Sequence, residues 1–285
     1  MTLPHPLLAA NLSVDYRNKT GVLRNISLRI ERQEILGLVG QSGSGKSTLS
    51  LALMGLLSSK SGSVRGEILF RGKDLLKSSE KDLRAIRGKE ISIVLQSPLA
   101  ALNPALSIGS QLTEAWKAHE RGNTAQGESS IQSALTSVSL PHDKEFLRRR
   151  PSQLSVGQGQ RVCIAMAILH RPALLLADEA TSALDPITQS EILNLFARLN
   201  REMRTAILYI SHDLLSVAAL CHRICILHEG QIVECGTPEA IFNSPQHEYT
   251  RRLVAALPSP PPPQKNSDSR ETQHPEKTLQ EVTPY

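Results

Sequence analysis

The possible folds of this chain are narrowed most by a glycine-rich stretch, Gly40-Gln41-Ser42-Gly43-Ser44-Gly45-Lys46-Ser47-Thr48. The apolar run at 35–39 predicts a buried strand before it, and the run at 49–54 predicts a helix after it. The order of strand, glycine-rich turn and helix separates a phosphate-binding loop from a chance match. We therefore interpret residues 40–48, called the phosphate loop below, as a nucleotide-binding element rather than a linker.

The chemistry of the phosphate loop suits a polyphosphate. Its glycines let successive backbone N–H groups converge on an anion, and the helix N-terminus adds unpaired N–H groups and a positive dipole end. Lys46 offers a mobile charge to the β- and γ-phosphates, and the Ser47 hydroxyl offers a ligand to Mg²⁺. The predicted nucleotide-binding residues here are Gly40, Ser42, Gly43, Gly45, Lys46, Ser47 and Thr48.

The 285 residues suggest one large domain or two small ones, and no apolar run approaches the length of a membrane-spanning helix. The first six residues lack a basic segment, so we expect no signal peptide and a soluble cytoplasmic protein able to dock on a membrane protein. The net charge is +5, but the basic residues are dispersed along the chain and no recognisable nucleic-acid-binding module accompanies them. We therefore expect a nucleotide ligand and no nucleic-acid partner.

The four cysteines form no CxxC pair. Two of them, Cys221 and Cys225, lie near His222 and His228, which raises the possibility of a metal site. Cys225 falls in the apolar run 223–227, which predicts a strand. Buried free thiols in a reducing compartment are the favoured interpretation of all four residues, Cys163, Cys221, Cys225 and Cys235.

The N-terminal part predicts a pair of strands. Leu12, Val14 and Tyr16 alternate with polar residues, and a second apolar pattern covers 22–30 after a turn at 17–21. At the end of the first strand, the Tyr16 ring could stack on a purine base or merely cover a sheet edge. Residue chemistry alone leaves these two alternatives open.

The middle of the chain changes from strands to helices. The predicted elements are a short strand at 66–72, a helix at 74–87, a buried strand at 91–95 that delivers Gln96, a loop at 99–104, and a helical region at 108–147 with breaks at Gly122, Gly127 and Pro141. The helical region reads as a subdomain inserted in an α/β core. The neutral amide of Gln96 can contact Mg²⁺ or water, although a lone Gln after a strand carries little weight.

A second helix start with anion-binding character follows. Ser155 is a good N-cap for a helix through Leu169, and its hydroxyl and the following N–H groups form a second anion site. One nucleotide needs only one such site, so the presence of two is unusual.

Two more apolar strands end in chemically active side chains. The run at 173–177 is followed by Asp178 and Glu179, and the run at 206–211 by His212. Asp178 is placed to hold Mg²⁺ through water, and Glu179 to orient or deprotonate an attacking water. His212, at the end of a parallel strand, is placed to sense the γ-phosphate.

With these motifs assembled, the chain resembles the ATP-binding subunit of ABC transporters over roughly residues 8–257. The motifs that carry the resemblance are the phosphate loop, Gln96, Leu154-Ser155-Val156-Gly157-Gln158, 174–179, 182–185 and His212. The resemblance implies an α/β fold: a P-loop ATPase core with a mostly parallel sheet, an N-terminal antiparallel β subdomain and an inserted α-helical subdomain. It also implies ATP and Mg²⁺ as cofactors.

The resemblance assigns roles to individual residues. It makes Tyr16 the adenine-stacking aromatic and adds Ser155, Gly157 and Gln158 to the nucleotide-binding set. The catalytic residues it implies are Glu179, His212 and Gln96, and the metal ligands are Ser47, Gln96 and Asp178.

The chain resembles most the branch that imports dipeptides, oligopeptides or nickel, through residues 97–104, 232–238 and 241–251. Two positions depart from the family pattern. Val156 replaces a usual glycine and adds a β-branched side chain beside the phosphate, which leaves the tightness of a closed site open. Ala180 replaces a usual proline, and we expect little effect because both carboxylates remain.

The family's arrangement explains the two anion sites. Two ATPase subunits, identical or related, enclose two ATP molecules, with Ser155 and Gly157 of one subunit facing the γ-phosphate held by Lys46 of the other. The implied partners are integral-membrane permease subunits and, indirectly, an extracytoplasmic solute-binding protein. The implied location is the cytoplasmic face of the cell membrane, as a peripheral protein.

The expected domain organisation has two parts. Residues 1–257 form the ATPase domain, with a helical subdomain at about 98–154 and a C-terminal extension at about 231–257. Residues 258–285 form a proline-rich tail, for which we favour a disordered linker over a proline-motif ligand.

Two other functional classes compete with a transport ATPase. A soluble ABC-type ATPase acting on DNA or ribosomes usually carries a coiled-coil insertion or two tandem cassettes, and neither is seen in this sequence. A P-loop kinase or GTPase has no use for residues 155–158. The sequence does not name the cargo, because selectivity lies in the other subunits of such a transporter.

Overall fold

The computed structural model describes residues 5–57, 62–120 and 122–257, so the predicted tail at 258–285 lies outside the described residues. Two sheets organise it. The antiparallel sheet has the strand order β2 (Lys19–Ile30), β1 (Leu8–Tyr16), β4 (Gly62–Phe70) and β5 (Lys73–Asp74). The larger sheet has the order β10 (Gln231–Gly236), β9 (Arg223–His228), β3 (Ile35–Val39), β8 (Ala206–Ser211), β7 (Leu174–Asp178) and β6 (Ile91–Val94).

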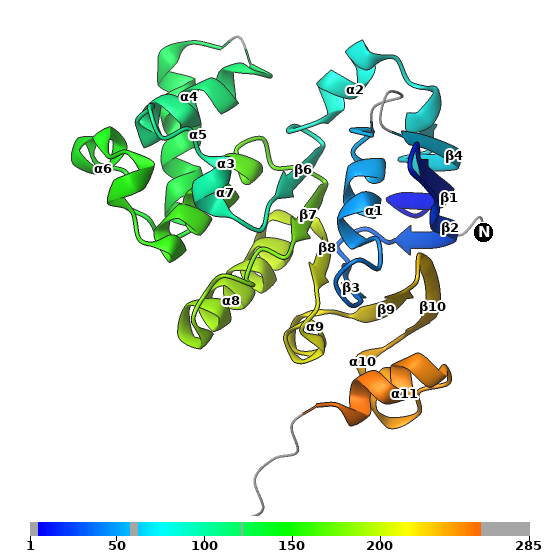
Figure 1. The fold of residues 1–285 in the computed structure, drawn as a ribbon. Helices are drawn as coiled ribbons and strands as arrows, with labels where there is room; N and C mark the ends of the chain where they lie inside the picture. The colour runs from blue at the N-terminus through cyan, green and yellow to red at the C-terminus, as the bar shows by residue number, and fades with distance from the viewer. Residues whose placement is uncertain (1–4, 58–61, 121, 258–285) are drawn as a thin grey trace, which may run out of the picture.

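The larger sheet is parallel from β9 to β6, and only β10 runs antiparallel to its neighbour. Figure 1 shows the antiparallel sheet on one side of the molecule and a block of helices on the other, with the parallel sheet between them. The helical elements are α1 (Lys46–Leu53), η1 (Leu75–Lys77), α2 (Glu80–Ile86), α3 (Pro98–Ala101), α4 (Ile108–Lys117), α5 (Thr124–Ser137), α6 (Lys144–Arg148), η2 (Pro151–Gln153), α7 (Val156–Ile168), α8 (Pro186–Met203), α9 (Leu214–Leu220), α10 (Pro238–Asn243) and α11 (Glu248–Ala255). The predicted α/β class is confirmed.

The core lies on both faces of the parallel sheet because successive side chains of a strand point to opposite faces. In β3, Ile35 and Val39 join the apolar cluster that includes the helical block, whereas Leu36 and Leu38 join a cluster with α1 and the antiparallel sheet. All four side chains are at most 2% exposed. The strand that leads into the phosphate loop is therefore fixed by packing on both faces.

Several predicted boundaries were wrong. The strand expected at 66–72 begins at Gly62 and ends at Phe70. The strand expected to end at Leu95 ends at Val94, and Leu95 is 45% exposed. The loop expected at 99–104 begins as helix α3, and the single helix expected at 74–87 is divided into η1 and α2 because Asp74 and Ser79 each cap a separate start.

The predicted helix break at Gly127 was also wrong, because α5 passes through this residue. A Cβ atom there would lie 3.0 Å from the Trp116 ring, so glycine serves close packing between α4 and α5 rather than a turn. The close packing of α5 on the indole ring offsets the low helix propensity of glycine.

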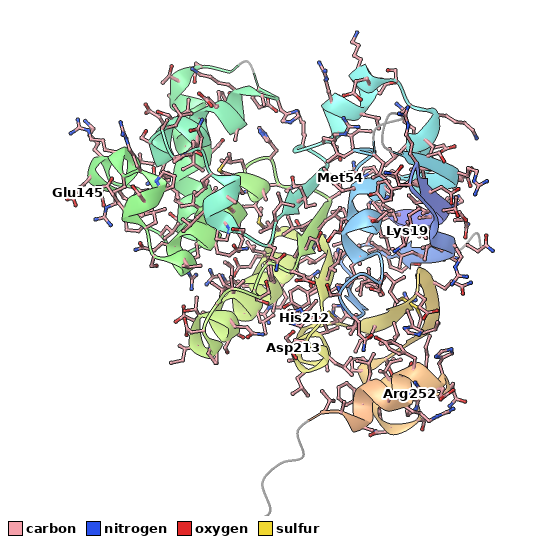
Figure 2. All side chains as sticks on the ribbon, viewed as in Figure 1. Lys19, Met54, Glu145, His212, Asp213 and Arg252 are labelled. Carbon is pink, nitrogen blue, oxygen red and sulfur yellow. A yellow bond between two sulfur atoms is a disulfide. The ribbon has the colours of Figure 1, made fainter. Side chains whose placement is uncertain are left out.

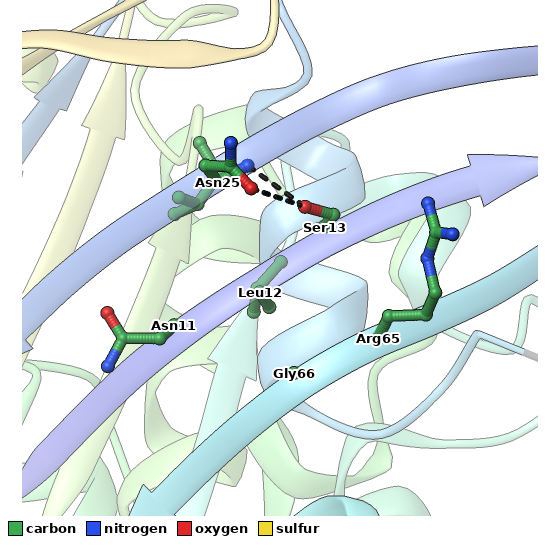
Figure 3. A pocket seen from close by; sticks show the side chains of 7 residues that line it. Asn11, Leu12, Ser13, Asn25, Arg65 and Gly66 are labelled. Carbon is green, nitrogen blue, oxygen red and sulfur yellow. Dashed lines mark hydrogen bonds between the residues drawn. The ribbon is translucent and has the colours of Figure 1, made fainter.

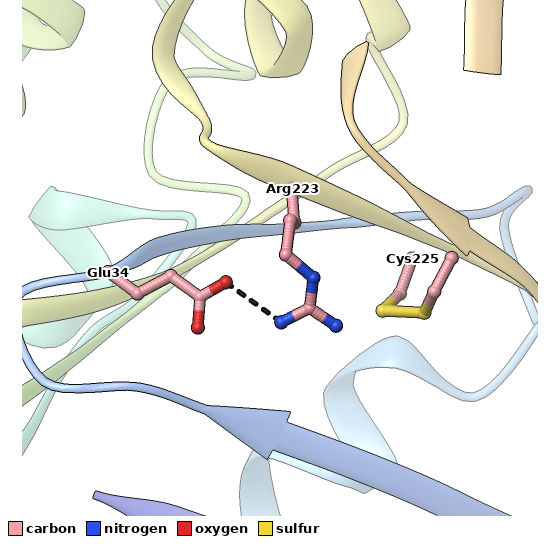
Figure 4. Close-up of a disulfide and its surroundings, with 4 residues drawn as sticks. Glu34, Arg223 and Cys225 are labelled. Atoms are coloured by element: carbon pink, nitrogen blue, oxygen red, sulfur yellow. Dashed lines mark hydrogen bonds and ion pairs between the residues drawn. A yellow bond between two sulfur atoms is a disulfide. The ribbon is translucent and has the colours of Figure 1, made fainter. Parts of the chain in front are cut away.

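The prediction of four free thiols was wrong for two of them. Cys225 and Cys235 form a disulfide between β9 and β10, with Cα atoms 4.2 Å apart, as Figure 4 shows; Cys163 and Cys221 are free. A one-residue register shift between Ile232 and Glu234 places the two cysteines opposite each other. Among the described residues, no group of three or more His, Cys, Asp or Glu side chains could hold a metal ion.

None of the helices within residues 5–57, 62–120 and 122–257 is both long and apolar enough to cross a lipid bilayer.

Candidate functional site

The predicted catalytic residues follow adjacent parallel strands. The phosphate loop follows β3, His212 follows β8, Glu179 follows β7 and Gln96 lies two residues beyond β6. These strands are neighbours in the order β3-β8-β7-β6, and their carboxyl ends meet at one edge of the sheet. Figure 2 shows His212 at this edge, above α9. The topology thus gathers residues that are up to 172 positions apart in the chain.

The phosphate loop folds around its own lysine. The Lys46 side chain is only 5% exposed. Its Nζ donates to the carbonyl oxygens of Gly40 at 2.8 Å and Gln41 at 3.1 Å. Gly45, at φ 109°, precedes the first helical residue, and a Cβ there would lie 2.6 Å from Leu23 Cδ2. Only glycine satisfies both the backbone conformation and the close approach of β2.

Lys46 also joins the loop to the acidic strand end. Its Nζ lies 3.3 Å from Glu179 Oε1, and His212 Nδ1 lies 3.7 Å from Glu179 Oε2. Glu179 has φ 50°, a left-handed conformation that costs energy for a non-glycine residue, and its N–H donates to Ile210 O at 2.9 Å. The strand edge therefore holds this carboxylate between a lysine and a histidine.

Asp178 ends β7 in a more enclosed position. It is 7% exposed, and its Oδ1 has no hydrogen-bond partner among the described residues. Burial raises the pKa of Asp178 above its usual range, while the neighbouring hydroxyls of Ser47 and Ser50 act in the opposite direction. A buried oxygen of this kind, beside a serine hydroxyl, is suited to a cation or to ordered water.

Two predicted residues lie at the margins of the loop. The hydroxyl of Tyr16 approaches Thr48 Oγ1 at 3.5 Å, which places the tyrosine ring, at the end of β1, beside the start of α1. Gln96 is exposed in the bend after β6.

The second predicted anion site is built as a capped helix start. Ser155 Oγ accepts from the N–H of Gln158, and Gln158 Oε1 accepts from the N–H of Ser155, both at 3.1 Å. Val156 is 41% exposed, and Gly157 faces Thr188, whose Cγ2 would lie 2.8 Å from an added Cβ. The start of α7 therefore lies at the surface, on a helix that packs with α3, α4 and α5 in the helical block.

Sequence reasoning missed several residues that shape this site. The carbonyl of Gln41 accepts from both Lys46 and the N–H of Ser44, at 3.1 and 3.2 Å. Tyr249 of α11 stacks on His228, in the hairpin whose Gly230 N–H donates to Ser44 O of the loop. Backbone carbonyls leave no signal in residue type, and nothing in the sequence pattern near Tyr249 pointed to the loop.

A separate hollow of about 440 Å³ lies on the outer face of the antiparallel sheet, as Figure 3 shows. Asn11 and Ser13 of β1, Asn25 of β2 and Arg65 of β4 line it. These residues alternate with the buried side chains of the same strands, so the hollow faces away from the phosphate loop.

Comparison with known proteins gives two family matches. Residues 23–182 match the family described as ABC transporter, and residues 233–281 match the family described as the oligopeptide/dipeptide transporter C-terminal region.

The similar proteins agree with these matches. The dipeptide transport ATP-binding protein DppD of Escherichia coli is 41% identical over 250 residues, which cover 87% of this chain and 76% of that protein. The glutathione import ATP-binding protein GsiA of Salmonella choleraesuis is 41% identical over 242 residues, 83% of this chain, but this chain spans only 39% of its length. A dimeric post-hydrolysis structure of the ATP-binding cassette MJ0796, bound to ADP and Pi, has a TM-score of 0.71 and 27% identity, covering 81% of this chain and 98% of that one.

Proposed function

The chain belongs to the ABC transporter family, and from that membership we propose that it is the ATP-hydrolysing subunit of an importer for short peptides. The observation that carries the proposal is the meeting of Lys46, Glu179 and His212 at one sheet edge in a chain whose C-terminal region matches peptide transporters. The named relatives act in import of dipeptides and glutathione. A nickel cargo stays a prediction from the branch resemblance.

The proposed reaction uses the side chains of the sheet edge in distinct roles. Lys46 leaves its carbonyl partners to bind the β- and γ-phosphates, which releases Glu179 from the ion pair. Glu179 then orients the attacking water and accepts its proton, and His212 contacts the γ-phosphate. Tyr16 stacks on the adenine ring.

The residues present fit Mg²⁺. The buried and unpartnered Oδ1 of Asp178, together with the Ser47 hydroxyl, provides the oxygen donors that this ion prefers. Ser47, Gln96 and Asp178 would hold it. When bound, Mg²⁺ supplies positive charge against the β- and γ-phosphates.

We further propose that two such subunits, identical or related, form a dimer that encloses ATP. Ser155, Gly157 and Gln158 of one subunit face the nucleotide of the other, which gives the exposed start of α7 a ligand. The dimeric cassette with ADP and Pi supports this arrangement by similarity. Loss of the γ-phosphate removes contacts that only the closed dimer makes, so hydrolysis opens it.

We propose that a membrane partner binds in an apolar groove of about 250 Å³ on the surface of the subunit. The groove lies between the parallel sheet and the helical block, and its lining includes Met54, Ile93, Leu95, Ala101 and Met166. Leu95 in this lining directly precedes Gln96 in the chain, so a permease segment seated there would sense the state of the nucleotide site through Gln96. We place the subunit at the cytoplasmic face of the membrane as a peripheral protein, with a solute-binding protein as an indirect partner.

The domain organisation that fits this role is the one expected from sequence. We propose an ATPase domain over 1–257, with a helical subdomain at about 98–154 and a C-terminal extension at about 231–257.

The test is an affinity purification of the tagged chain from detergent-solubilised membranes of its own host, followed by ATPase assay with and without EDTA. Integral-membrane subunits should copurify, and EDTA should abolish phosphate release. Association with ribosomes or DNA in place of membrane proteins would instead support the soluble ABC-type ATPase, an alternative that the transport relatives do not favour.

A further inference from the structure

We propose that Tyr249, in the C-terminal extension, is a positioning residue that sets the conformation of the phosphate loop for ATP binding. The inference rests on the proposed ATPase function and adds to it a role for the region that matches peptide transporters.

The extension is attached to the core next to the loop. Glu234 of β10 accepts hydrogen bonds from the N–H groups of Gln246 at 2.8 Å and His247 at 3.0 Å. His247 Nδ1 in turn accepts from the N–H of Tyr249 at 3.1 Å and caps the start of α11. These bonds fix where α11 begins, and thereby the direction of the Tyr249 side chain.

The ring of Tyr249 is held on the core by stacking. It lies against the His228 ring, with centroids 3.8 Å apart and planes inclined by 16°. His228 ends β9, the strand that pairs with β3 just before the phosphate loop. Tyr249 is 8% exposed, so its hydroxyl is directed into the protein rather than toward solvent.

The hydroxyl of Tyr249 is buried and has no hydrogen-bond partner among the described residues. Burial raises the pKa of Tyr249, and the backbone of Gln41, in the phosphate loop, acts in the opposite direction. A buried hydroxyl without a completed partner is costly, so this one is available to complete a bond when the loop tightens.

In this proposal the peptide between Gly40 and Gln41 connects the tyrosine to the lysine. Its carbonyl accepts from Lys46 Nζ at 2.8 Å, and its N–H is the loop group that lowers the pKa of Tyr249. A rotation of this peptide would move the carbonyl that holds Lys46. Tyr249 restricts that rotation, and thereby influences the position of the Lys46 side chain when ATP binds.

The hairpin that carries His228 supports the same loop. The N–H of Gly230 donates to Ser44 O at 3.1 Å, and a Cβ on Gly40 would lie 2.4 Å from Leu227 O. The loop thus rests on the β9–β10 hairpin, and Tyr249 of α11 stacks on His228 of the same hairpin. The extension and the loop therefore contact one common support.

The test uses full-length Tyr249→Phe, which keeps the stacked ring and removes only the hydroxyl. We expect the KM for ATP to rise about fivefold, the effect of one neutral hydrogen bond, with kcat changed less than about twofold. The thermal unfolding midpoint should stay at the wild-type value. Arg252→Gln is the matched control, since Arg252 lies on α11 but is exposed and bonds to Glu248; its KM should be unchanged.

The possible outcomes distinguish a failure of the positioning role of Tyr249 from a failure of the proposed function. An unchanged KM in Tyr249→Phe, beside an active wild type, would overturn the positioning role and leave the proposed function intact. A lowered unfolding midpoint, with kcat reduced as strongly as KM is raised, would show that the tyrosine serves only stability. This result would also overturn the positioning role. A wild-type protein that neither binds nor hydrolyses ATP would refute the proposed function, and this inference with it.

Discussion

Lys46 and Glu179 meet at 3.3 Å although their proposed roles differ, one as a phosphate ligand and the other as a base. The lysine is almost fully buried, and burial of an ammonium group needs compensation by a carboxylate or by carbonyl oxygens. The phosphate loop supplies the carbonyl oxygens of Gly40 and Gln41, and the end of β7 supplies the carboxylate of Glu179. A bound polyphosphate can replace these carbonyl and carboxylate partners of Lys46. The ion pair with Lys46 therefore stabilises the buried lysine and also holds the proposed base, Glu179, until a nucleotide binds.

The first prediction concerns this carboxylate. Glu179→Gln keeps the size of the side chain and its left-handed backbone but removes the base, so ATP should still bind while hydrolysis falls by about 10²- to 10⁴-fold. Loss of a negative charge near the phosphates should also make the closed dimer accumulate. Phosphate release, fluorescent ATP binding and size-exclusion chromatography with ATP would measure these effects. Near-normal hydrolysis in the variant would rule out Glu179 as the base.

The second prediction concerns the departure at Val156. Val156→Gly removes an exposed β-branched side chain from the first position of α7 and should preserve or raise turnover that depends on protein concentration. The cost to the helix should stay below about 1 kcal/mol, because helix starts tolerate glycine better than interiors. ATPase rates over a concentration series would measure turnover, with Val156→Ala for comparison. A large loss at unchanged stability would mean that valine is specifically required.

At the scale of elements, the loop and strand pattern of the nucleotide site was predictable because it rests on local chemistry. An apolar run followed by glycines and Lys46 specifies strand, turn and helix within a few residues. The pairing of Cys225 with Cys235 was not predictable. An unshifted hairpin would place Glu234 opposite Cys225, and only the one-residue bulge before Glu234 aligns the two sulfur atoms. Bulges depend on tertiary contacts, here the N–H groups of Gln246 and His247 that Glu234 binds.

The third prediction tests this disulfide. Reduction should lower the free energy of unfolding by about 2 to 3 kcal/mol, since the bond closes a loop with a sequence separation of 10. Urea unfolding with and without dithiothreitol would measure the change, and the double variant Cys225→Ser/Cys235→Ser should not respond to the reductant. Titration of thiols in denaturant should find only Cys163 and Cys221. Four titratable thiols in untreated protein would show that the bond is absent.

The fourth prediction concerns the contact between α4 and α5. Gly127→Val should destabilise the protein by about 1 to 3 kcal/mol, because the added side chain would press on the Trp116 ring. Glu128→Val is the matched control, since it adds the same side chain at an exposed neighbouring position of α5. Tryptophan fluorescence during urea unfolding reports on Trp116, the single tryptophan of the chain. Equal stability of the two variants would mean that the helices separate without cost.

At the scale of the whole molecule, the parallel sheet positions three surfaces: the phosphate loop, the start of α7 and the apolar groove. The phosphate loop lies at the carboxyl ends of β3, β8 and β7, α7 packs with α3, α4 and α5 in the helical block, and the apolar groove lies beside β6. A single subunit cannot bring its own α7 start to its own loop if both are fixed to the same core. The arrangement therefore makes sense for a protein that works as a pair and transmits the closing of that pair to a partner in the groove.

The last prediction tests that transmission. Ala101 is exposed at the end of α3 and lines the groove, so Ala101→Asp introduces a charge into an apolar surface without burying it in the core. The purified subunit should keep its own ATPase rate, but copurification with the membrane subunits should fall at least about tenfold, as one unpaired charge in an apolar interface costs more than about 1.4 kcal/mol. Ala101→Ser, which is small and neutral, should copurify as the wild type does. If Ala101→Asp still copurifies fully and supports peptide uptake in cells, the permease docks elsewhere and the groove has no part in coupling.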